Sequence, residues 1–341
     1  MTEVNMKILS IETSCDETSV AIVEDGRKIL TNRIYSQIDI HKKYGGVVPE
    51  IASRNHITKL PYIIEDALEE TQMRLEDVDA IGVTNGPGLI GALLVGLSEA
   101  KAIAYSLDKP LIGVHHIEGH IAANFLQYPE LEPPFLTLVV SGGHSHLVLV
   151  EDYQTFKVLG RTIDDAAGEA FDKISRVLGF GYPGGPAIDC AAKKGDPEAI
   201  AFPRVFLDKK EYNFSFSGLK SSVLNYINSK KMKNEPIVVN DVAASFQMAV
   251  VEVLVKKTIA CAKGIHMNKI CMAGGVSCNS LLRQMMTDAA KEEGLSLYYP
   301  DPILCTDNAA MIGSMAYYNF INGAVSDLSL NGIPGLKIGT R

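Results

Sequence analysis

The sequence lacks several features that would place it in a familiar class of protein. None of its six cysteines belongs to a C-x-x-C pair, which argues against a thiolate zinc site and against a disulfide scaffold. Reduced thiols of this kind are typical of cytoplasmic proteins. No G-x-x-x-x-G-K-S/T motif occurs, so a P-loop enzyme is excluded. The most apolar stretch, residues 88–97, is too short and too rich in glycine to span a membrane.

Basic side chains are also scarce. The chain has 32 Lys and Arg against 40 Asp and Glu, a formal net charge of −8, which argues against a broad surface for nucleic acid. Local patches remain compatible with this charge. They are the lysine groups at residues 42–43, 193–194, 209–210 and 230–233. Scattered, solvated lysines are the alternative interpretation of each group.

What is present describes a soluble globular protein. With 341 residues, of which 47% are hydrophobic and 21% charged, the chain is long enough for two domains that each bury a core. Its polar N-terminus leads directly into a strand-like run, so it does not resemble a signal peptide. We therefore expect a cytoplasmic protein without a membrane partner.

One pattern occurs once in each half of the chain. An apolar strand, a small polar turn and a second strand that ends in acidic residues are expected at residues 7–25 and again at residues 136–152. Because a repeat outweighs local signals in the choice of an architecture, it predicts two related lobes. Helices and further strands alternate after each hairpin, so both lobes are expected to be mixed α/β. Ligands of such sheets lie beyond the strand ends, which predicts a nucleotide cleft between the lobes.

Apolar periodicity and turn residues divide the chain further. We expect an N-terminal lobe at residues 1–133 and a C-terminal lobe at residues 134–306, with a C-terminal helix at residues 307–341 packing back on the first lobe. The other expected helices lie at residues 57–70, 89–107, 166–178, 241–263 and 279–292, and the apolar pattern of the C-terminal helix is read at residues 307–319. The other expected strands lie at residues 80–84, 110–114, 269–273 and 296–299.

Two of the three histidines at residues 115–120 indicate a metal site. On a helix, His116 and His120 are one turn apart and point two imidazoles at the same spot. Imidazole suits zinc, iron, nickel or copper. Glu118 is wrongly placed for the H-E-x-x-H motif of a zinc protease. Two polar residues on a half-exposed helix are the alternative interpretation.

A metal site needs a third ligand. Asp307, which precedes an apolar helix, offers a carboxylate, although it could serve only as a helix cap. Two histidines and one carboxylate would leave coordination positions open for a substrate.

Three glycine-rich loops follow expected strands or helices in the second half of the chain. Residues 141–145, 182–186 and 273–279 each allow backbone amides to approach a phosphate, and together they favour one nucleotide site over three unrelated turns. Residues 86–91 match G-x-G-x-x-G, but they follow a late strand of their lobe and are interpreted as a tight turn.

Three carboxylates lie beside these motifs. Asp172, on an expected helix, could bind ribose hydroxyls or pair with a lysine. Glu12 and Asp16, in the first hairpin, are candidate acid or base groups, with ordinary turn residues as the alternative.

Eight segments of the chain, in order, resemble a single family. They are residues 12–16, 116–120, 140–144, 168–173, 182–186, 214–220, 273–277 and 306–308, which read ETSCD, HIEGH, VSGGH, GEAFDK, YPGGP, FSFSGLK, AGGVS and TDN. They resemble the bacterial tRNA N6-adenosine threonylcarbamoyltransferases, the TsaD family, once described as glycoproteases. The resemblance covers essentially the whole chain.

This resemblance implies an actin-like, sugar-kinase-like (ribonuclease H-like) fold of two duplicated lobes. It implies an acyltransferase that moves a threonylcarbamoyl group from threonylcarbamoyl-AMP to N6 of the adenosine beside the anticodon, in tRNAs that read codons beginning with adenine. The metal ligands that it implies are His116, His120 and Asp307. The nucleotide-binding residues that it implies are Val139, Val140, Ser141, Gly142, Gly143, Asp172, Gly185, Asp189 and Asn279.

The resemblance also implies cofactors and partners. One divalent metal per subunit is expected, iron(II) or in its place zinc, with Mg²⁺ accompanying a bound nucleotide. The partners are tRNA, a catalytically inert paralogue (TsaB-like) and a small ATPase (TsaE-like). Because the chain is acidic, we expect these partner subunits to supply much of the basic surface that holds tRNA.

The chemistry of the transfer agrees with these residue types. An exocyclic adenine amine is a weak nucleophile, so the carbamoyl carbonyl must be polarised, which a metal with open positions does as a Lewis acid. Glu12 or Asp16 is expected to help with the amine proton. Two other classes remain as alternatives: a metalloprotease, and an ATP-binding scaffold or kinase of the same fold, which would need magnesium but no histidine ligands.

Overall fold

The computed structural model describes residues 5–206 and 212–339, which form two compact units. Unit 1 comprises Met1–Pro133, Val150–Phe156 and Pro300–Arg341, and unit 2 comprises Pro134–Leu149 and Lys157–Tyr299. The lysines at 209–210 lie outside the described residues.

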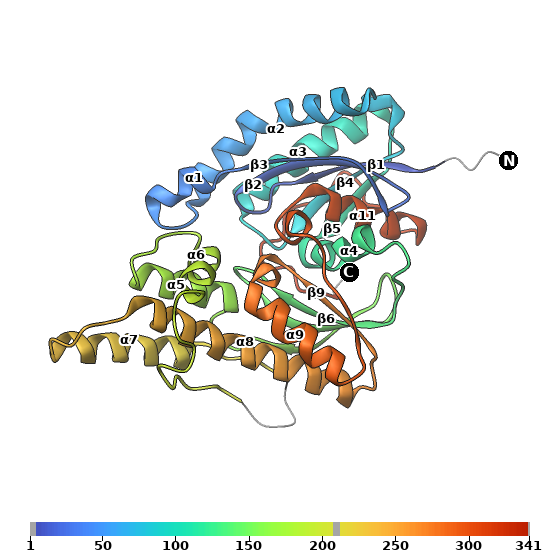
Figure 1. The fold of residues 1–341 in the computed structure, drawn as a ribbon. Helices are drawn as coiled ribbons and strands as arrows, with labels where there is room; N and C mark the ends of the chain where they lie inside the picture. The colour runs from blue at the N-terminus through green and yellow to red at the C-terminus, as the bar shows by residue number, and fades with distance from the viewer. Residues whose placement is uncertain (1–4, 207–211, 340–341) are drawn as a thin grey trace. The chain divides into compact units, whose positions relative to one another are not determined.

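Unit 1 is built on a five-stranded mixed sheet with the strand order β3-β2-β1-β4-β5 (Figure 1). The strands are β1 Lys7–Glu12, β2 Glu17–Glu24, β3 Lys28–Ser36, β4 Ala80–Gly86 and β5 Leu111–His115. The strand β1 pairs antiparallel with β2 and parallel with β4, and β4 pairs parallel with β5. Since β1, β4 and β5 are parallel, their carboxyl ends meet at one edge of the sheet, where ligands of α/β sheets bind.

Helices cover both faces of this sheet. The α-helices of unit 1 are α1 Ile38–His41, α2 Pro49–Thr71, α3 Ile90–Leu107, α4 His116–Gln127, α10 Pro302–Cys305 and α11 Ala309–Ile321. The helices α2 and α3 pack together on one face, and α4 and α11 pack together on the other. The helix α3 is long and apolar enough to cross a membrane, but core helices pass the same test, and Leu93 and Leu97 of α3 lie in the unit 1 core.

Unit 2 repeats this topology. Its strands are β6 Phe135–Val140, β7 Ser145–Val150, β8 Phe156–Arg161, β9 Lys269–Ala273 and β10 Ser296–Tyr298. Their order, β8-β7-β6-β9-β10, matches that of unit 1 strand for strand. The helices are α5 Ala167–Val177, α6 Gly184–Ala192, α7 Ser217–Met232, α8 Val239–Gly264 and α9 Ser280–Glu292. The predicted internal repeat and the α/β fold of two duplicated lobes are therefore confirmed.

Several predicted boundaries were wrong. The helix expected at residues 307–319 is present as α11, Ala309–Ile321, but it does not extend toward residue 341, since residues 322–339 form turns and extended chain. Glycines and a proline interrupt any apolar period there, so the helix could not continue. The helix α2 begins eight residues before the predicted start at 57, because Pro49 at its first turn is compatible with a helix.

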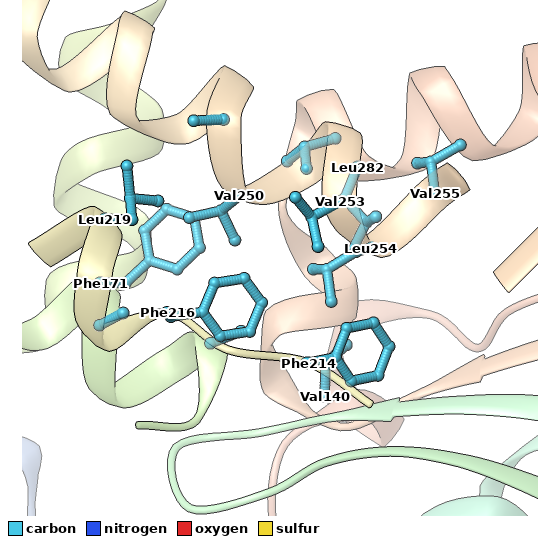
Figure 2. Packing of buried hydrophobic residues seen from close by; sticks show 14 of the residues in the cluster. Val140, Phe171, Phe214, Phe216, Leu219, Val250, Val253, Leu254, Val255 and Leu282 are labelled. Atoms are coloured by element: carbon cyan, nitrogen blue, oxygen red, sulfur yellow. The ribbon is translucent and has the colours of Figure 1, made fainter. Parts of the chain in front are cut away.

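The core of unit 2 gathers aromatic side chains from several elements. Phe171, Phe214 and Phe216 are at most 1% exposed and pack with Val250 and Leu254 of α8 (Figure 2). The rings of Phe214 and Phe216 stack with centroids 6.2 Å apart. The segment 214–220, one of the eight segments that carry the family resemblance, thus begins with residues of the core.

Replacing Phe214 with alanine should lower the free energy of unfolding by about 3–5 kcal/mol, because it leaves a cavity between β6 and α8. Phe206, which is 48% exposed, is the matched control, and its replacement should cost about 0.5 kcal/mol or less. Denaturant titration of both variants measures the difference. Equal losses of unfolding free energy in the two variants would show that neighbouring side chains move in to fill the cavity left by Phe214.

Candidate metal centre and nucleotide loops

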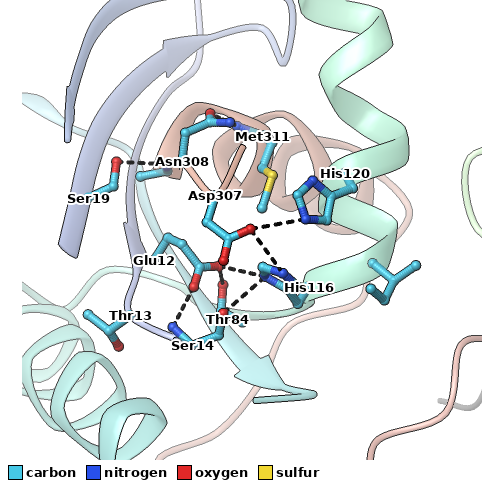
Figure 3. Close-up of polar contacts among 12 residues, drawn as sticks. Glu12, Thr13, Ser14, Ser19, Thr84, His116, His120, Asp307, Asn308 and Met311 are labelled. Carbon is cyan, nitrogen blue, oxygen red and sulfur yellow. Dashed lines mark hydrogen bonds and ion pairs between the residues drawn. The ribbon is translucent and has the colours of Figure 1, made fainter. Parts of the chain in front are cut away.

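Three candidate metal ligands meet in unit 1. The helix α4 begins immediately after β5, so His116 lies in its first turn and His120 one turn later. Asp307 lies between α10 and α11, next to both histidines (Figure 3). One ligand atom from each residue lies within 4.8 Å of the others. The structure therefore brings together the two histidines and the carboxylate that the sequence singled out.

The geometry of these atoms suits a single cation. Asp307 Oδ1 lies 3.4 Å from His116 Nε2 and 3.1 Å from His120 Nε2. His120 Nε2 is buried and makes no well-formed hydrogen bond, so an otherwise orphaned nitrogen is aimed at the shared carboxylate oxygen. Two imidazoles and one carboxylate are ligands that iron(II) and zinc accept. The cluster thus fits one divalent metal.

Asp307 is not the cap of the helix that follows it. Asn308 takes that role, and its side-chain oxygen accepts a hydrogen bond from the Met311 amide at 3.0 Å. The Asp307 side chain keeps 21% of its surface exposed, whereas that of His120 keeps 1%. The open side of the cluster is therefore the side of the carboxylate.

Glu12 lies behind His116, away from the ligand position. Glu12 is fully buried, and its Oε2 lies 3.0 Å from His116 Nδ1. It accepts hydrogen bonds of 2.5 Å from the Ser14 amide and from the Thr84 hydroxyl. Because a carboxylate only accepts, His116 carries a proton on Nδ1, so Nε2, which faces Asp307, is the nitrogen that would bind a metal in place of a proton.

The pKa shifts of the groups around the cluster indicate an excess of negative charge there. Burial would lower the pKa of His116, but the carboxylates of Asp307 and Glu12 outweigh it and raise that pKa well above its usual value. Burial opposes ionisation of Asp307 as well, yet His116 and His120 hold its pKa well below the usual range. For Glu17, burial and then the charges of Asp307 and Asp16 raise the pKa well above normal. Excess negative charge of this kind favours a bound cation.

Asp16 is placed differently from Glu12. It lies in the turn between β1 and β2 and is 6% exposed. In the described part of the chain, neither His116 nor His120 is hydrogen-bonded to it. The two carboxylates that the sequence proposed as acid or base groups therefore have different surroundings.

The first of the three glycine-rich loops follows β6 in unit 2. Val139 and Val140 end that strand as buried residues, and Ser141, Gly142 and Gly143 form the turn to β7. A Cβ built on Gly142 or Gly143 would meet nothing within 4 Å. Open space beside backbone amides is what close approach of a phosphate requires.

Two other loops close on this turn. A Cβ on Gly168 would lie 2.5 Å from the Ser141 carbonyl oxygen, and one on Gly274 would lie 2.4 Å from that of Val140. Gly274 has a φ of +87°, which other residues rarely adopt. Glycine at these two positions thus allows the ends of β6 and β9 and the start of α5 to pack closely.

The remaining candidates are linked in the same unit. Asp172 Oδ1 accepts a hydrogen bond from the Gly184 amide at 2.7 Å, which ties α5 to the start of α6. Asp189, on α6, accepts one from the Ser280 hydroxyl at 2.7 Å. Ser280 follows Asn279, whose side chain caps α9 through the Leu282 amide. The predicted nucleotide residues therefore form one connected set.

Sequence reasoning missed several partners of these residues. Thr84, on β4, hydrogen-bonds Glu12, and no pattern in the sequence distinguishes it from other strand residues. Gln247, on α8, accepts a hydrogen bond from the Asn279 side chain at 2.8 Å. With Lys193 and Ser280 it lines a hollow of about 330 Å³ beside the candidate nucleotide residues.

Two adjacent glycines give a test of these loops. A Cβ on Gly184 would lie 2.5 Å from Asp172 Cα, so Gly184→Ala should destabilise unit 2, whereas Gly185 has nothing within 4 Å. We expect Gly185→Ala to keep the wild-type melting temperature and to weaken binding of AMP about tenfold, because the methyl group occupies ligand space. Calorimetric titration with AMP measures this. Unchanged affinity would remove Gly185 from the site.

Comparison with known proteins shows which family the chain resembles. A family model described as TsaD, tRNA N6-adenosine threonylcarbamoyltransferase, matches residues 28–314. The chain is 60% identical over 338 residues to the tRNA N6-adenosine threonylcarbamoyltransferase of Clostridium kluyveri, with 99% of each chain covered. It is 58% identical over 330 residues to that of Clostridioides difficile, with 97% of this chain and 98% of the relative covered.

Solved structures support the fold alone. The chain superposes on full-length HypF with a TM-score of 0.63 at 15% identity, covering 94% of this chain and spanning 47% of HypF. It superposes on the activator of 2-hydroxyisocaproyl-CoA dehydratase from Clostridium difficile with a TM-score of 0.53 at 13% identity, covering 94% of this chain and 99% of the activator.

Proposed function

Because this chain belongs to the tRNA N6-adenosine threonylcarbamoyltransferase family, we propose that His116, His120 and Asp307 are its metal ligands and that the glycine loops of unit 2 hold its nucleotide substrate. The chain is an acyltransferase that modifies tRNA by adding a threonylcarbamoyl group to N6 of adenosine. The observation that carries the metal assignment is the convergence of three ligand atoms on one position.

Threonylcarbamoyl-AMP is the donor in this proposal, and the acceptor is the adenosine beside the anticodon of tRNAs that read codons beginning with adenine. An adenylate offers a phosphate, a ribose and a base. The open turn at Gly142 and Gly143 suits the phosphate, and the carboxylates of Asp172 and Asp189 suit hydroxyl groups. Val139, Val140, Ser141, Gly185 and Asn279 complete the proposed site, and Mg²⁺ would accompany a bound nucleotide.

A bound iron(II) or zinc ion would supply Lewis-acid polarisation of the carbamoyl carbonyl. The residues of the chain supply the rest. His116 and His120 are held in place by α4, and Glu12 keeps the His116 proton on Nδ1. The glycine loops fix the adenylate, which turns a bimolecular attack into an oriented one.

The two first-hairpin carboxylates take separate roles in this proposal. Glu12 is fully buried and already accepts three hydrogen bonds, so it is a positioning residue rather than an acceptor for the amine proton. Asp16 interacts with Cys15 and Glu17 rather than with either imidazole, and it remains the candidate for assisting the amine.

The partners in this proposal are tRNA, an inert paralogue of the TsaB type and a small ATPase of the TsaE type, all in the cytoplasm. In two of the described lysine groups one lysine is ion-paired: Lys230 pairs with Glu235 at 2.6 Å, and Lys193 pairs with Asp189 at 3.1 Å. With a net charge of −8, the chain by itself holds a polyanion weakly.

We therefore expect tRNA affinity to rise at least about tenfold when the partner subunits are added at matched salt, because each neutralised phosphate releases a counterion. Titration of labelled tRNA at two salt concentrations checks this. The salt slope should steepen with the partners present. Equal affinity and equal slope with and without partners would refute it.

Transfer of threonylcarbamoyl from synthetic threonylcarbamoyl-AMP to tRNA, with the partners present, tests the proposed function. A tRNA that reads codons beginning with adenine should be modified, and a tRNA that reads other codons should not. Failure of the metal-loaded protein to transfer would reopen a kinase-like or scaffold role on the same fold.

A further inference from the structure

The chain after α11 runs beside β5 and then reaches the carboxyl end of β4. The Ser326 amide donates to the Leu111 carbonyl at 2.8 Å, and the Ser326 hydroxyl accepts from the Gly113 amide at 3.1 Å. Residues 333–339, here called the C-terminal strap, continue beyond this point. The Ile333 amide donates to the Asn85 carbonyl at 2.8 Å. The strap thus lies at the sheet edge from which α4 departs.

His115 connects the strap to the helix that carries the candidate metal ligands. It ends β5 and is the N-cap of α4, where its Nδ1 accepts a hydrogen bond from the Ile117 amide at 3.1 Å. An accepting Nδ1 carries no proton, so the proton of the neutral ring is on Nε2. Nε2 lies 3.3 Å from the Leu336 carbonyl oxygen. One imidazole therefore spans from the strap to the first turn of α4.

A second route runs through the turn before α3. The Gly88 amide donates to the Pro334 carbonyl at 3.2 Å, and the Leu89 amide donates to the Ser14 carbonyl at 2.8 Å. A Cβ on Gly88 would lie 2.7 Å from the Ser14 carbonyl oxygen, so the turn is packed closely on Ser14. Ser14 in turn contacts His116, with its hydroxyl 3.2 Å from Nδ1.

Both routes converge on His116, one through the backbone of α4 and one through Ser14. The strap itself buries little: Ile333 is 46% exposed, and Pro334, Gly335 and Lys337 are also exposed. Segments with few buried contacts open before the core does. We therefore expect the hydrogen bonds of the strap to open more readily than the buried contacts around α4.

We propose that His115 is a positioning residue that couples the C-terminal strap to the metal centre. The strap, hydrogen-bonded as described above, sets the metal affinity because it holds the first turn of α4 in place. The proposal rests on the metal site proposed above. His115 does not bind the metal in this account. It fixes the helix terminus from which His116 and His120 project, as outer partners of metal ligands do.

Three full-length variants separate capping from coupling. His115→Asn keeps a good N-cap but is too short to reach Leu336, and His115→Phe removes both contacts. Gly335→Ala is the matched strap control, because a Cβ there meets nothing within 4 Å. Zinc affinity is measured by competition with a chelator dye. Hydrogen exchange of the amides at residues 116–119 is measured in the metal-free proteins.

We expect His115→Asn to bind zinc about tenfold more weakly and to exchange these amides faster, with Gly335→Ala like wild type in both measurements. His115→Phe should lose more zinc affinity than His115→Asn and should exchange these amides faster. Wild-type affinity and exchange in His115→Asn would overturn the coupling and leave His115 as a helix cap only. If wild type itself binds no zinc, the metal site fails, and the exchange rates still decide whether the strap holds α4.

Discussion

Replacing both His116 and His120 with alanine is expected to remove the bound metal and to slow threonylcarbamoyl transfer by a factor of about a thousand. That factor corresponds to about 4 kcal/mol, within the several kcal/mol of transition-state stabilisation that a Lewis-acid metal supplies. Asp307 would be left alone with a buried Glu12, and one carboxylate ligand does not hold iron(II) or zinc at micromolar concentration.

Metal per chain and single-turnover transfer should be measured on the same preparations, with partners and a saturating amount of threonylcarbamoyl-AMP. His266→Asn is the matched control, since His266 is an exposed turn residue with a φ of +56°, which asparagine tolerates. It should keep both metal and activity. Full transfer by the metal-free double variant would make the metal incidental and would move the chemistry to the carboxylates of the first hairpin.

Glu12→Gln, which keeps the size of the side chain, should weaken metal binding about 10- to 100-fold. The Ser14 amide donates to Glu12 Oε1, so the side-chain oxygen of the glutamine must occupy the position of Oε1. Its NH2 group then faces His116 Nδ1, which has to become an acceptor. The proton moves to His116 Nε2, where it occupies the lone pair that the metal needs.

Asp16→Asn is the comparison that separates positioning from proton transfer. Because Asp16 is not hydrogen-bonded to either imidazole, this variant should bind metal as wild type does. If Asp16 assists the amine, its replacement should lower the single-turnover rate at saturating metal by about a hundredfold. Glu12→Gln, assayed at saturating metal, should recover most of its activity. A Glu12 variant that binds metal normally but transfers slowly would reverse these two roles.

The local sequence determined which residues could bind a metal. His116 and His120 are separated by one helical turn, and this spacing alone faces their imidazoles the same way once a helix forms. The hairpin repeat, read from short apolar runs with acidic ends, determined the duplicated α/β architecture, because the period of two in a strand is a local property.

Only the tertiary structure decided what surrounds these residues. Asp307 is 187 positions after His120, and the sequence leaves open whether it caps a helix or joins the histidines; the packing of α11 against α4 brings it to them. The same holds for Thr84 and Leu336, whose contacts with Glu12 and His115 join segments far apart in the chain. Local patterns carry no record of such pairings, because they arise from how strands and helices pack, and packing fixes which buried polar groups must satisfy one another.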